Sequence, residues 1–184
     1  RTPSYDAVVA GGGIIGLACA WRAARAGLAV RVLERDTVGP GASGVAAGML
    51  APVGEASWGE DALLGLGLES LRRWERFAAE LEADSGEPAG LRRLGALHIA
   101  LDRDEAEALR RHHELHLRLG LESEWLRPRA CRRLEPGLST SVTAGLHAPG
   151  DAAADPTVLT ATLASALRRM EVPVDEGAQV VGLE

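Results

Sequence analysis

The 184-residue sequence contains no lysine and no asparagine, so all 20 basic residues are arginine. A catalytic Schiff-base lysine and the lysine of a phosphate-binding loop are therefore excluded from this chain. Aromatic residues are also scarce, at 3% of the sequence. Because alanine, glycine, arginine and leucine dominate instead, the composition is typical of a GC-rich coding sequence and carries no functional information.

Cysteines are few, with two in the sequence, and long apolar runs and an excess of positive charge are missing. Cys19 and Cys131 lack the spacing of metal ligands, which indicates a reducing compartment and no disulfide framework. No segment has the ~18 uninterrupted apolar residues of a membrane-spanning helix. The net charge of −6 opposes binding to nucleic acid. We therefore predict a cytoplasmic protein without a membrane span or a nucleic-acid partner.

The first forty residues have the clearest periodicity. Residues 5–10 form a short apolar run typical of a buried parallel strand, and residues 29–33 form a second. Between them, apolar side chains recur at three-to-four spacing over residues 13–26, and Gly27 suits the C-cap of that helix. This order predicts a βαβ unit, in which we expect Cys19 to be buried.

Further elements are expected along the rest of the chain. Helices are predicted over 61–83, 102–119, 128–134 and 156–170, the last with Asp155 as N-cap and Pro156 at its first position. Strands are predicted over 93–101, 141–148, 172–174 and 179–183. Since the sequence stops at Glu184, at the end of a predicted strand, we expect the chain to be a part of a longer fold.

A glycine motif, Gly11-x-Gly13-x-x-Gly16, lies between the first strand and the first helix, and Glu34 ends the second strand. This is the dinucleotide-binding fingerprint in its required context. Gly11 permits a tight turn, Gly13 lets the backbone approach a pyrophosphate, and Gly16 lets the helix pack closely. The helix N-terminus stabilises phosphate charge. Glu34 can accept hydrogen bonds from ribose hydroxyls and disfavours a 2′-phosphate.

The segment that follows decides between nicotinamide and flavin nucleotides. Residues 39–52, with the sequence Gly-Pro-Gly-Ala-Ser-Gly-Val-Ala-Ala-Gly-Met-Leu-Ala-Pro, resemble the second flavin-contacting loop of the glycine oxidase and D-amino acid oxidase family. The match is closest to glycine oxidases of thiamin biosynthesis. Residues 93–100, 150–156 and 180–184 extend the resemblance, which covers nearly the whole chain but only the N-terminal half of the family's fold.

The resemblance implies an α/β fold. We expect a doubly wound, Rossmann-like FAD-binding domain interleaved with part of an α+β substrate domain. Residues 1–85 would form the first part of the FAD-binding domain, residues 86–148 a partial substrate-domain segment, and residues 149–184 the return to the FAD-binding domain. The C-terminal half of the family's fold would be absent.

FAD is the cofactor that the fingerprint and the resemblance together predict. Ser43 can donate to a phosphate, and Met49 offers a polarisable side chain beside an aromatic ring. In the family, a valine corresponding to Val180 holds the adenine through its backbone. The predicted cofactor-binding residues are Gly11, Gly13, Ile14, Ile15, Gly16, Glu34, Arg35, Ala42, Ser43, Ala47, Gly48, Met49 and Val180.

The family's chemistry implies oxidative deamination of glycine or of another small amine or D-amino acid. Hydride passes to the flavin, the imine is hydrolysed, and O2 is reduced to H2O2. The expected partners are the small amine or amino-acid substrate and O2, and a homo-oligomer stays open. The family's carboxylate-binding arginine and its pocket tyrosine lie in the half that is absent here, so we predict no catalytic residue.

Several alternatives stay open. Within the family, the chain could come from a sarcosine oxidase or a D-amino acid dehydrogenase. It could also be a truncated, non-catalytic nucleotide-binding fragment, or one half of a protein completed by a second chain. An NAD-dependent dehydrogenase would explain the fingerprint but not residues 42–52.

A histidine-rich run is the remaining candidate for chemistry. His112 and His116 lie one helical turn apart, a spacing that a metal could use, with His113 beside them. No third ligand is apparent, and the metalloprotease order His-Glu-x-x-His is absent. We therefore predict a polar helix face and no metal site.

Overall fold

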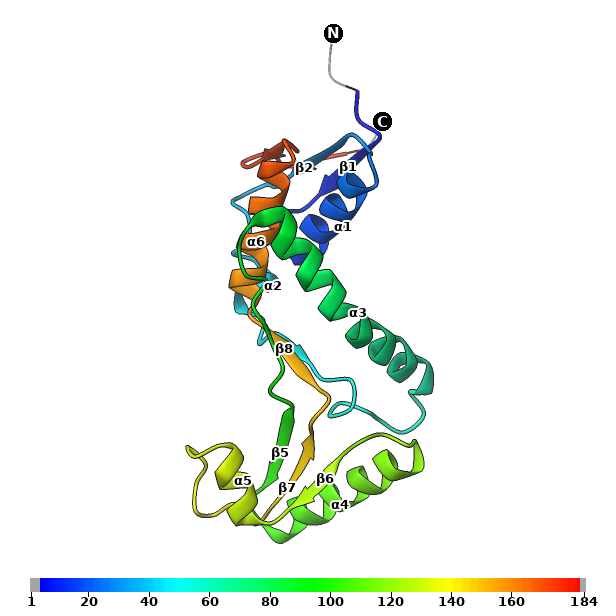
Figure 1. The fold of residues 1–184 in the computed structure, drawn as a ribbon, viewed down its shortest axis with the longest axis vertical. Coiled ribbons are helices and arrows are strands. Elements are labelled where there is room, and N and C mark those ends of the chain that lie inside the picture. The colour runs from blue at the N-terminus through cyan, green and yellow to red at the C-terminus, as the bar shows by residue number, and fades with distance from the viewer. Residues whose placement is uncertain (1–3, 183–184) are drawn as a thin grey trace. The chain divides into compact units, whose positions relative to one another are not determined.

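The computed structural model describes residues 4–182, and its helices and strands alternate along most of the chain (Figure 1). The helices are α1 (Ile14–Arg25), α2 (Ala42–Val45), α3 (Asp61–Ser85), α4 (Arg103–Arg118), α5 (Pro128–Leu134) and α6 (Pro156–Arg169). The strands are β1 (Ala7–Ala10), β2 (Val30–Leu33), β3 (Met49–Leu50), β4 (Leu91–Arg92), β5 (Ala96–Ala100), β6 (Glu124–Leu126), β7 (Ala144–Ala148), β8 (Ala152–Ala154) and β9 (Val174–Asp175).

The chain forms two compact units, each assembled from separate stretches of sequence. The first unit contains the residues up to 48, residues 75–91 and the residues from 154 onward, and the second contains residues 49–74 and 92–153. The long helix α3 contributes to both units. The domain division at residues 85 and 148 stays a prediction.

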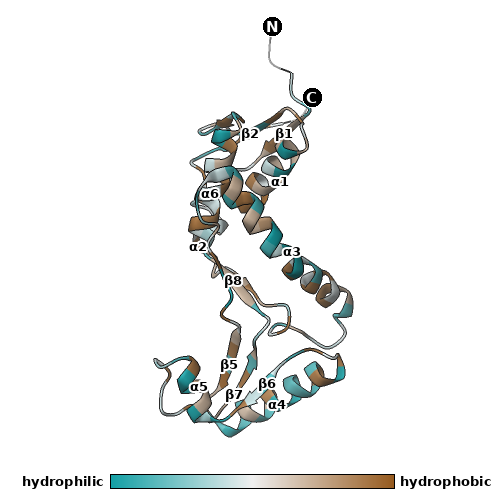
Figure 2. Cartoon of the chain, viewed as in Figure 1, coloured by the Kyte–Doolittle hydropathy of each residue, from teal (hydrophilic) through white to brown (hydrophobic). Residues whose placement is uncertain are grey.

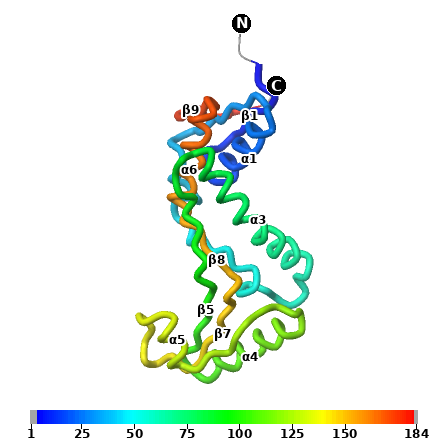
Figure 3. The backbone as a smooth tube through the Cα atoms, in the orientation of Figure 1, coloured from blue at the N-terminus to red at the C-terminus, as the bar shows by residue number. Residues whose placement is uncertain are grey.

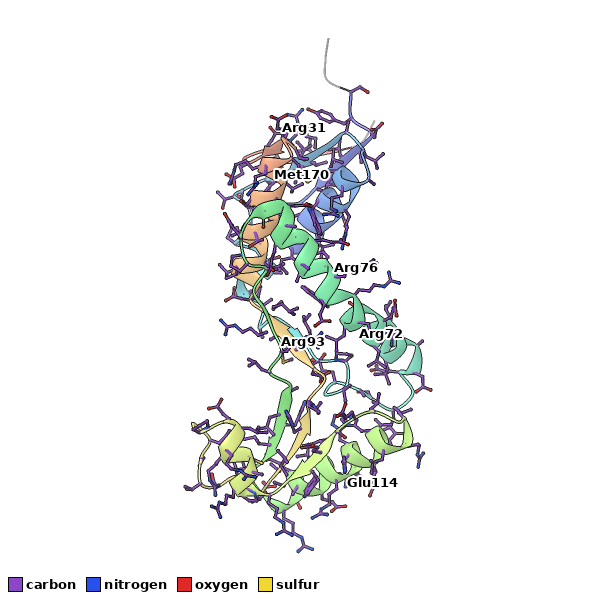
Figure 4. All side chains as sticks on the ribbon, in the orientation of Figure 1. Arg31, Arg72, Arg76, Arg93, Glu114 and Met170 are labelled. Carbon is purple, nitrogen blue, oxygen red and sulfur yellow. The ribbon has the colours of Figure 1, made fainter. Side chains whose placement is uncertain are left out.

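The first unit is built on the predicted βαβ arrangement. Strands β1 and β2 pair in parallel, with Ala7 opposite Val30 and Ala10 opposite Leu33, and β9 continues the parallel sheet beyond β2. Arg31, labelled in Figure 4, forms an ion pair with Asp175 between β2 and β9. Helix α1 packs against α6. The sequence-based strand, helix and strand of residues 5–33 are therefore confirmed.

Trp21 lies at the centre of the packing between α1 and the last part of α3. It is fully buried, its ring lies edge-on to that of Phe77 at 5.1 Å, and its Nε1 donates to Asp84 at 2.9 Å. The guanidinium of Arg22 lies over both rings and pairs with Glu80. A buried indole requires such a hydrogen-bond partner, which α3 supplies here.

Cys19 is exposed, which corrects the prediction that α1 buries it. The helix buries Leu17, Ala20 and Trp21. Successive residues are rotated by about 100° around a helix, so Cys19 lies roughly opposite Leu17. Ile15, one turn before Cys19, is 78% exposed and lies on the same side. The helix is therefore buried along one face only among the described residues.

Residues 179–182 do not form the strand predicted over 179–183, and residue 183 lies outside the described residues. A strand needs a neighbouring strand for its hydrogen bonds, and residues 4–182 place none beside this segment. The preceding turn is instead tied to the end of β2, because Gly177 N donates to Asp36 O and Ala178 N donates to Glu34 O.

Helix α6 begins as the sequence predicts. The Asp155 carboxylate accepts hydrogen bonds from the backbone N–H groups of Thr157 and Val158, at 3.0 and 3.1 Å, and Pro156 occupies the first turn. We expect Asp155→Ala to lower the free energy of unfolding by about 1 kcal/mol, since two N–H groups lose their acceptor. Urea unfolding measures this change. Asp155→Asn should lose less, because its side-chain oxygen still accepts.

The second unit contains an antiparallel sheet in the order β5-β7-β6. Strands β5 and β7 lie side by side in Figure 3, with Ala96 opposite Ala148 and Ala100 opposite Ala144. Helix α4 packs Leu109 against Ala100 and Leu146 of this sheet. The N-cap Asp102 accepts from Glu105 N at 2.9 Å, as expected of acidic residues at a helix start.

The short strands β3, β4, β6 and β8 were not predicted, because two or three residues carry no periodicity. Strand β3 pairs antiparallel with β8, with Met49 opposite Ala153. Helix α5 agrees with the predicted turn over residues 128–134. Within residues 4–182, no helix combines the length and hydropathy required to cross a bilayer.

The histidines of α4 do not lie on a polar, solvated face, which corrects the prediction made for them. His116 is fully buried, and His112 is partly buried. Hydrophilic colours dominate α4 in Figure 2, but Leu109, His112 and His116 follow each other at intervals of three and four residues. That spacing places them on the helix face that meets the sheet.

Candidate functional site

A pocket of about 450 Å³ opens beside the N-terminus of α1 in the first unit. Its walls come from the turn after β1, from residues 33–37 at the end of β2, from the loop 39–43, and from residues 178–180. Its volume is within the range of small-molecule and cofactor sites in proteins.

The turn between β1 and α1 requires glycine at two positions. Gly11 has a φ of +111°, a conformation that other residues rarely adopt, and its N–H donates to Leu33 O at 2.8 Å. A Cβ atom at Gly16 would overlap the carbonyl oxygen of Gly11. Helix α1 can therefore begin immediately after β1 only because both residues lack a side chain.

The N-terminus of α1 presents its donors toward the pocket. Gly13, the N-cap residue, offers no side-chain cap. Instead, Ile14 N donates to the hydroxyl oxygen of Ser43 at 2.9 Å. Because that oxygen accepts from Ile14, the O–H of Ser43 remains able to donate to an anion. The helix dipole adds a partial positive charge at the same place, so this end of the pocket favours phosphate.

Glu34 provides the acidic side of the pocket. One carboxylate oxygen accepts from Gly12 N at 2.6 Å, and the other accepts from Asp36 N at 2.9 Å. The N–H of Asp36, followed by that of Gly12, holds the pKa of Glu34 below its ordinary value. The group is therefore ionised at neutral pH, and its remaining lone pairs can accept hydrogen bonds from hydroxyl groups. Arg35 forms an exposed pair with Asp36 at 3.1 Å.

The structure brings most of the predicted cofactor-binding residues to this pocket. The predicted residues that line the pocket are Gly11, Gly13, Glu34, Arg35, Ala42, Ser43 and Val180. Ile14 contributes its N–H to Ser43, while the side chain of Ile15 is exposed. Gly16 acts through its contact with Gly11. The cofactor-binding roles of these residues stay predictions.

Ala47, Gly48 and Met49 are not among the residues that line the pocket. Gly48 has a φ of +76°, and its carbonyl oxygen accepts from Ala154 N at 2.8 Å. Met49 belongs to β3 in the second unit, and its side chain is 60% exposed. A role beside a flavin ring stays a prediction for these three residues.

Other residues line the pocket that the sequence did not single out. Asp36 and Thr37 continue the end of β2 beyond Arg35, and Gln179 precedes Val180. Each lies within two positions of a predicted residue in the sequence, and this proximity was the available signal. The hydrogen bond from Ala178 N to Glu34 O brings residues 178–180 to the pocket. It joins residues 144 positions apart, and such a contact leaves no periodic pattern in the sequence.

Comparison with known proteins agrees with a site for a dinucleotide. Residues 6–184 match the family described as FAD dependent oxidoreductase. The chain belongs to this family. FAD is the cofactor of the family, as the sequence predicts. The chain is 34% identical to the glycine oxidase of Geobacillus kaustophilus over 166 residues, which are 90% of this chain and 44% of that protein.

A second relative is the bifunctional protein ThiO/ThiG of Synechocystis sp., which is 32% identical over 95% of this chain and 25% of that protein. The crystal structure of the Geobacillus kaustophilus glycine oxidase superposes with a TM-score of 0.86 and 32% identity, over 94% of this chain and 46% of that structure. The resemblance to glycine oxidases and the mixed α/β, Rossmann-like fold class are confirmed. The chain spans less than half the length of these relatives.

Proposed function

We propose that this chain holds FAD in the pocket beside α1, and that the protein which contains it oxidatively deaminates glycine or another small amine or D-amino acid. Bound FAD would supply the acceptor of the substrate hydride, the imine product would be hydrolysed by water, and O2 would take the two electrons from the reduced cofactor to give H2O2. One observation carries this proposal: the α1 N-terminus, the Ser43 hydroxyl and the Glu34 carboxylate all lie around one pocket.

The residues of the pocket fit the parts of an FAD molecule. The N-terminus of α1 and the O–H of Ser43 would hold the pyrophosphate, since both donate hydrogen bonds. The ionised Glu34 would accept from the adenosine ribose hydroxyls. The backbone at Val180 would lie against the adenine. When bound, FAD supplies the hydride acceptor, while the chain orients the nucleotide.

FAD binding tests the first part of the proposal. We expect the purified chain to quench the fluorescence of added FAD with a saturable titration, and to bind NAD+ far more weakly. Extraction of any copurified nucleotide identifies it directly. Equal binding of NAD+ would support the NAD-dependent alternative, and no binding of either nucleotide would contradict the proposed site.

The substrate and the fate of the electrons are a separate part of the proposal. We expect the full-length protein that carries this chain to release H2O2 fastest with glycine, compared with sarcosine and D-alanine. Fastest turnover of sarcosine would favour a sarcosine oxidase. Turnover that needs an artificial electron acceptor and releases little H2O2 would indicate a D-amino acid dehydrogenase. No turnover by flavin-loaded protein would leave a non-catalytic nucleotide-binding chain.

The names of the relatives suggest a biological setting. One relative is the bifunctional protein ThiO/ThiG, so we propose a role in thiamin thiazole biosynthesis. A cytoplasmic location is supported by the two free cysteines. A complementation assay in a bacterial strain that lacks glycine oxidase and requires thiamin would test this role, and failure of an active enzyme to restore growth would argue against it.

A further inference from the structure

A segment of the second unit, residues 51–57, has no helix or strand, yet residues 51, 53, 54 and 56 within it are buried. Ala51, Val53 and Ala56 are each at most 7% exposed. Buried backbone polar groups require hydrogen-bond partners, and an irregular segment must find some of them outside itself. The partners here come from titratable side chains.

Asp151 supplies two of these partners. Its carboxylate accepts from Val53 N at 3.1 Å and from Gly54 N at 2.8 Å, and the side chain is buried, with the residue 1% exposed. The backbone of Asp151 is itself fixed, because its carbonyl oxygen accepts from Gly95 N at 3.0 Å. A Cβ atom at Gly54 would lie 2.7 Å from His98 Nε2 and 3.2 Å from Asp151 Oδ2. Glycine at this position therefore allows the close approach.

Three histidines complete the contact with the segment. His112 Nε2 lies 2.8 Å from Ala56 O, and since a carbonyl oxygen only accepts, His112 donates. The ring of His112 lies 4.4 Å from that of His116 and 5.9 Å from that of His98, measured between centroids. Strand β5 provides His98, and α4 provides the other two. Glu114, labelled on α4 in Figure 4, is exposed to solvent.

His116 cannot easily carry a charge in this position. It is fully buried, and neither ring nitrogen has a hydrogen-bond partner with ordinary geometry. Burial, and then the neighbouring His112, lower the pKa of His116 to about 4, against a small opposing effect of the Val53 backbone. His113 and, more weakly, His98 act in the same direction as His112 and also lower this pKa. Burial also lowers the pKa of His98 and raises that of Asp151.

The remaining charged group beside this cluster is Glu55, which belongs to the segment itself and is exposed. It acts on His98 and on Asp151, raising the pKa of each. It therefore stabilises a proton on either group, but its exposed carboxylate is screened by water. When the segment is closed, the lowered pKa values of His98 and His116 therefore favour the neutral form of both rings.

We propose that Asp151, His98, His112 and His116 form an acid-sensitive anchor that holds residues 51–57 in place at neutral pH and releases them in acid. The inference does not depend on the proposed cofactor. The same segment forms one wall of an apolar cavity of about 260 Å³, and Leu64, Leu71 and Trp74 of α3 lie on the other. Release of the anchor would therefore open this cavity.

The direction of the pH effect follows from the proton balance. With the segment closed, His116 has a pKa of about 4. Once the segment opens, the side chain meets water and regains its ordinary pKa of about 6.5. At His116, and likewise at His98, the open state then binds more protons, so acid favours opening, whereas the raised pKa of Asp151 acts in the opposite direction. For this group alone, the opening constant increases about 30-fold between pH 7.5 and pH 5.

Hydrogen exchange of the Val53 and Gly54 amides, corrected for intrinsic exchange rates, measures this opening. We expect protection in the unaltered chain to fall between pH 7.5 and pH 5, with His116 contributing a factor of about 30. His116→Gln should remove this factor and leave only the pH dependence that comes from His98 and Asp151. His113→Gln is the matched control: it removes a neighbouring imidazole that bonds Ser123 instead of the segment, and the pH dependence should persist.

A second pair of measurements guards against a variant that does not fold. His116→Leu also removes the proton site while filling the buried space, and it should reduce the pH dependence by the same factor as His116→Gln. Asp151→Asn should lower protection of Val53 and Gly54 at both pH values, since an amide cannot accept from both N–H groups. The proposal is overturned if protection in the unaltered chain is the same at both pH values, or if either His116 variant retains the full pH dependence.

Discussion

Replacing Gly16 with alanine is expected to abolish FAD binding by this chain. The new Cβ would overlap the carbonyl oxygen of Gly11, so α1 would have to move away from the turn that starts it. That movement displaces the helix N-terminus and the Ile14 N–H that meets Ser43. Overpacking of this kind also costs about 1–3 kcal/mol of stability. Fluorescence titration with FAD, together with urea unfolding, measures both effects.

Gly65→Ala is the matched control for this substitution. Gly65 lies within α3, and a Cβ atom there would meet open space. Because alanine is the better helix former, this variant should gain about 0.5–1 kcal/mol in the free energy of unfolding and bind FAD unchanged. Normal FAD affinity in the Gly16→Ala variant would show that the glycine turn does not shape the cofactor site.

Replacing Glu34 with alanine is expected to weaken FAD binding by about 10- to 100-fold. This range corresponds to the loss of one hydrogen bond to a charged group, which contributes about 1.5–3 kcal/mol. The carboxylate has two tasks. It would accept from the ribose hydroxyls, and it also fixes the turn through Gly12 N and Asp36 N. Isothermal titration calorimetry with FAD measures the loss.

The two tasks of Glu34 can be separated. Glu34→Gln retains an oxygen for one backbone N–H but loses the charge, so it should lie between the alanine variant and the unaltered chain. Glu114→Ala removes the same charge from an exposed position on α4 and should bind FAD unchanged. FAD affinity that stays constant in Glu34→Ala would remove the ribose assignment.

Acid should weaken FAD binding through the same carboxylate. The N–H groups of Asp36 and Gly12 lower the pKa of Glu34, so the group stays ionised through the neutral range and becomes protonated only below its ordinary pKa. We therefore expect FAD affinity to be constant near neutrality and to fall in acid. Titrations in Glu34→Gln, which lacks the titrating group, should show a smaller decrease.

Local signals in the sequence predicted much of the fold. The N-cap at Asp155 and the apolar spacing within α1 depend on residues close together in the chain, and the structure agrees with both. The failures have non-local causes. Residues 179–182 do not form a strand because a strand depends on its neighbours. Cys19 is exposed because the packing of α1 buries a narrower face than its apolar composition indicates.

The candidate site was predictable to a similar extent. The glycine spacing and Glu34 have fixed positions within one βαβ unit, so the sequence identified the pocket. The prediction of a polar face for the histidines of α4 was wrong, because it followed from their polar residue type. Their spacing from Leu109 places them on the buried face of the helix. The support that Asp151 gives to Val53 and Gly54 joins positions about a hundred residues apart and could not be predicted from a single sequence.

The two cysteines differ in their exposure to solvent, and each compact unit contains one of them. Cys19 is exposed on α1 in the first unit, whereas Cys131 is fully buried on α5 in the second. A thiol reagent should thus alkylate Cys19 in the native protein and reach Cys131 only when the second unit opens. Mass spectrometry distinguishes the second adduct from the first. The rate at which the second adduct forms therefore reports how often the second unit opens, whatever state the first unit is in.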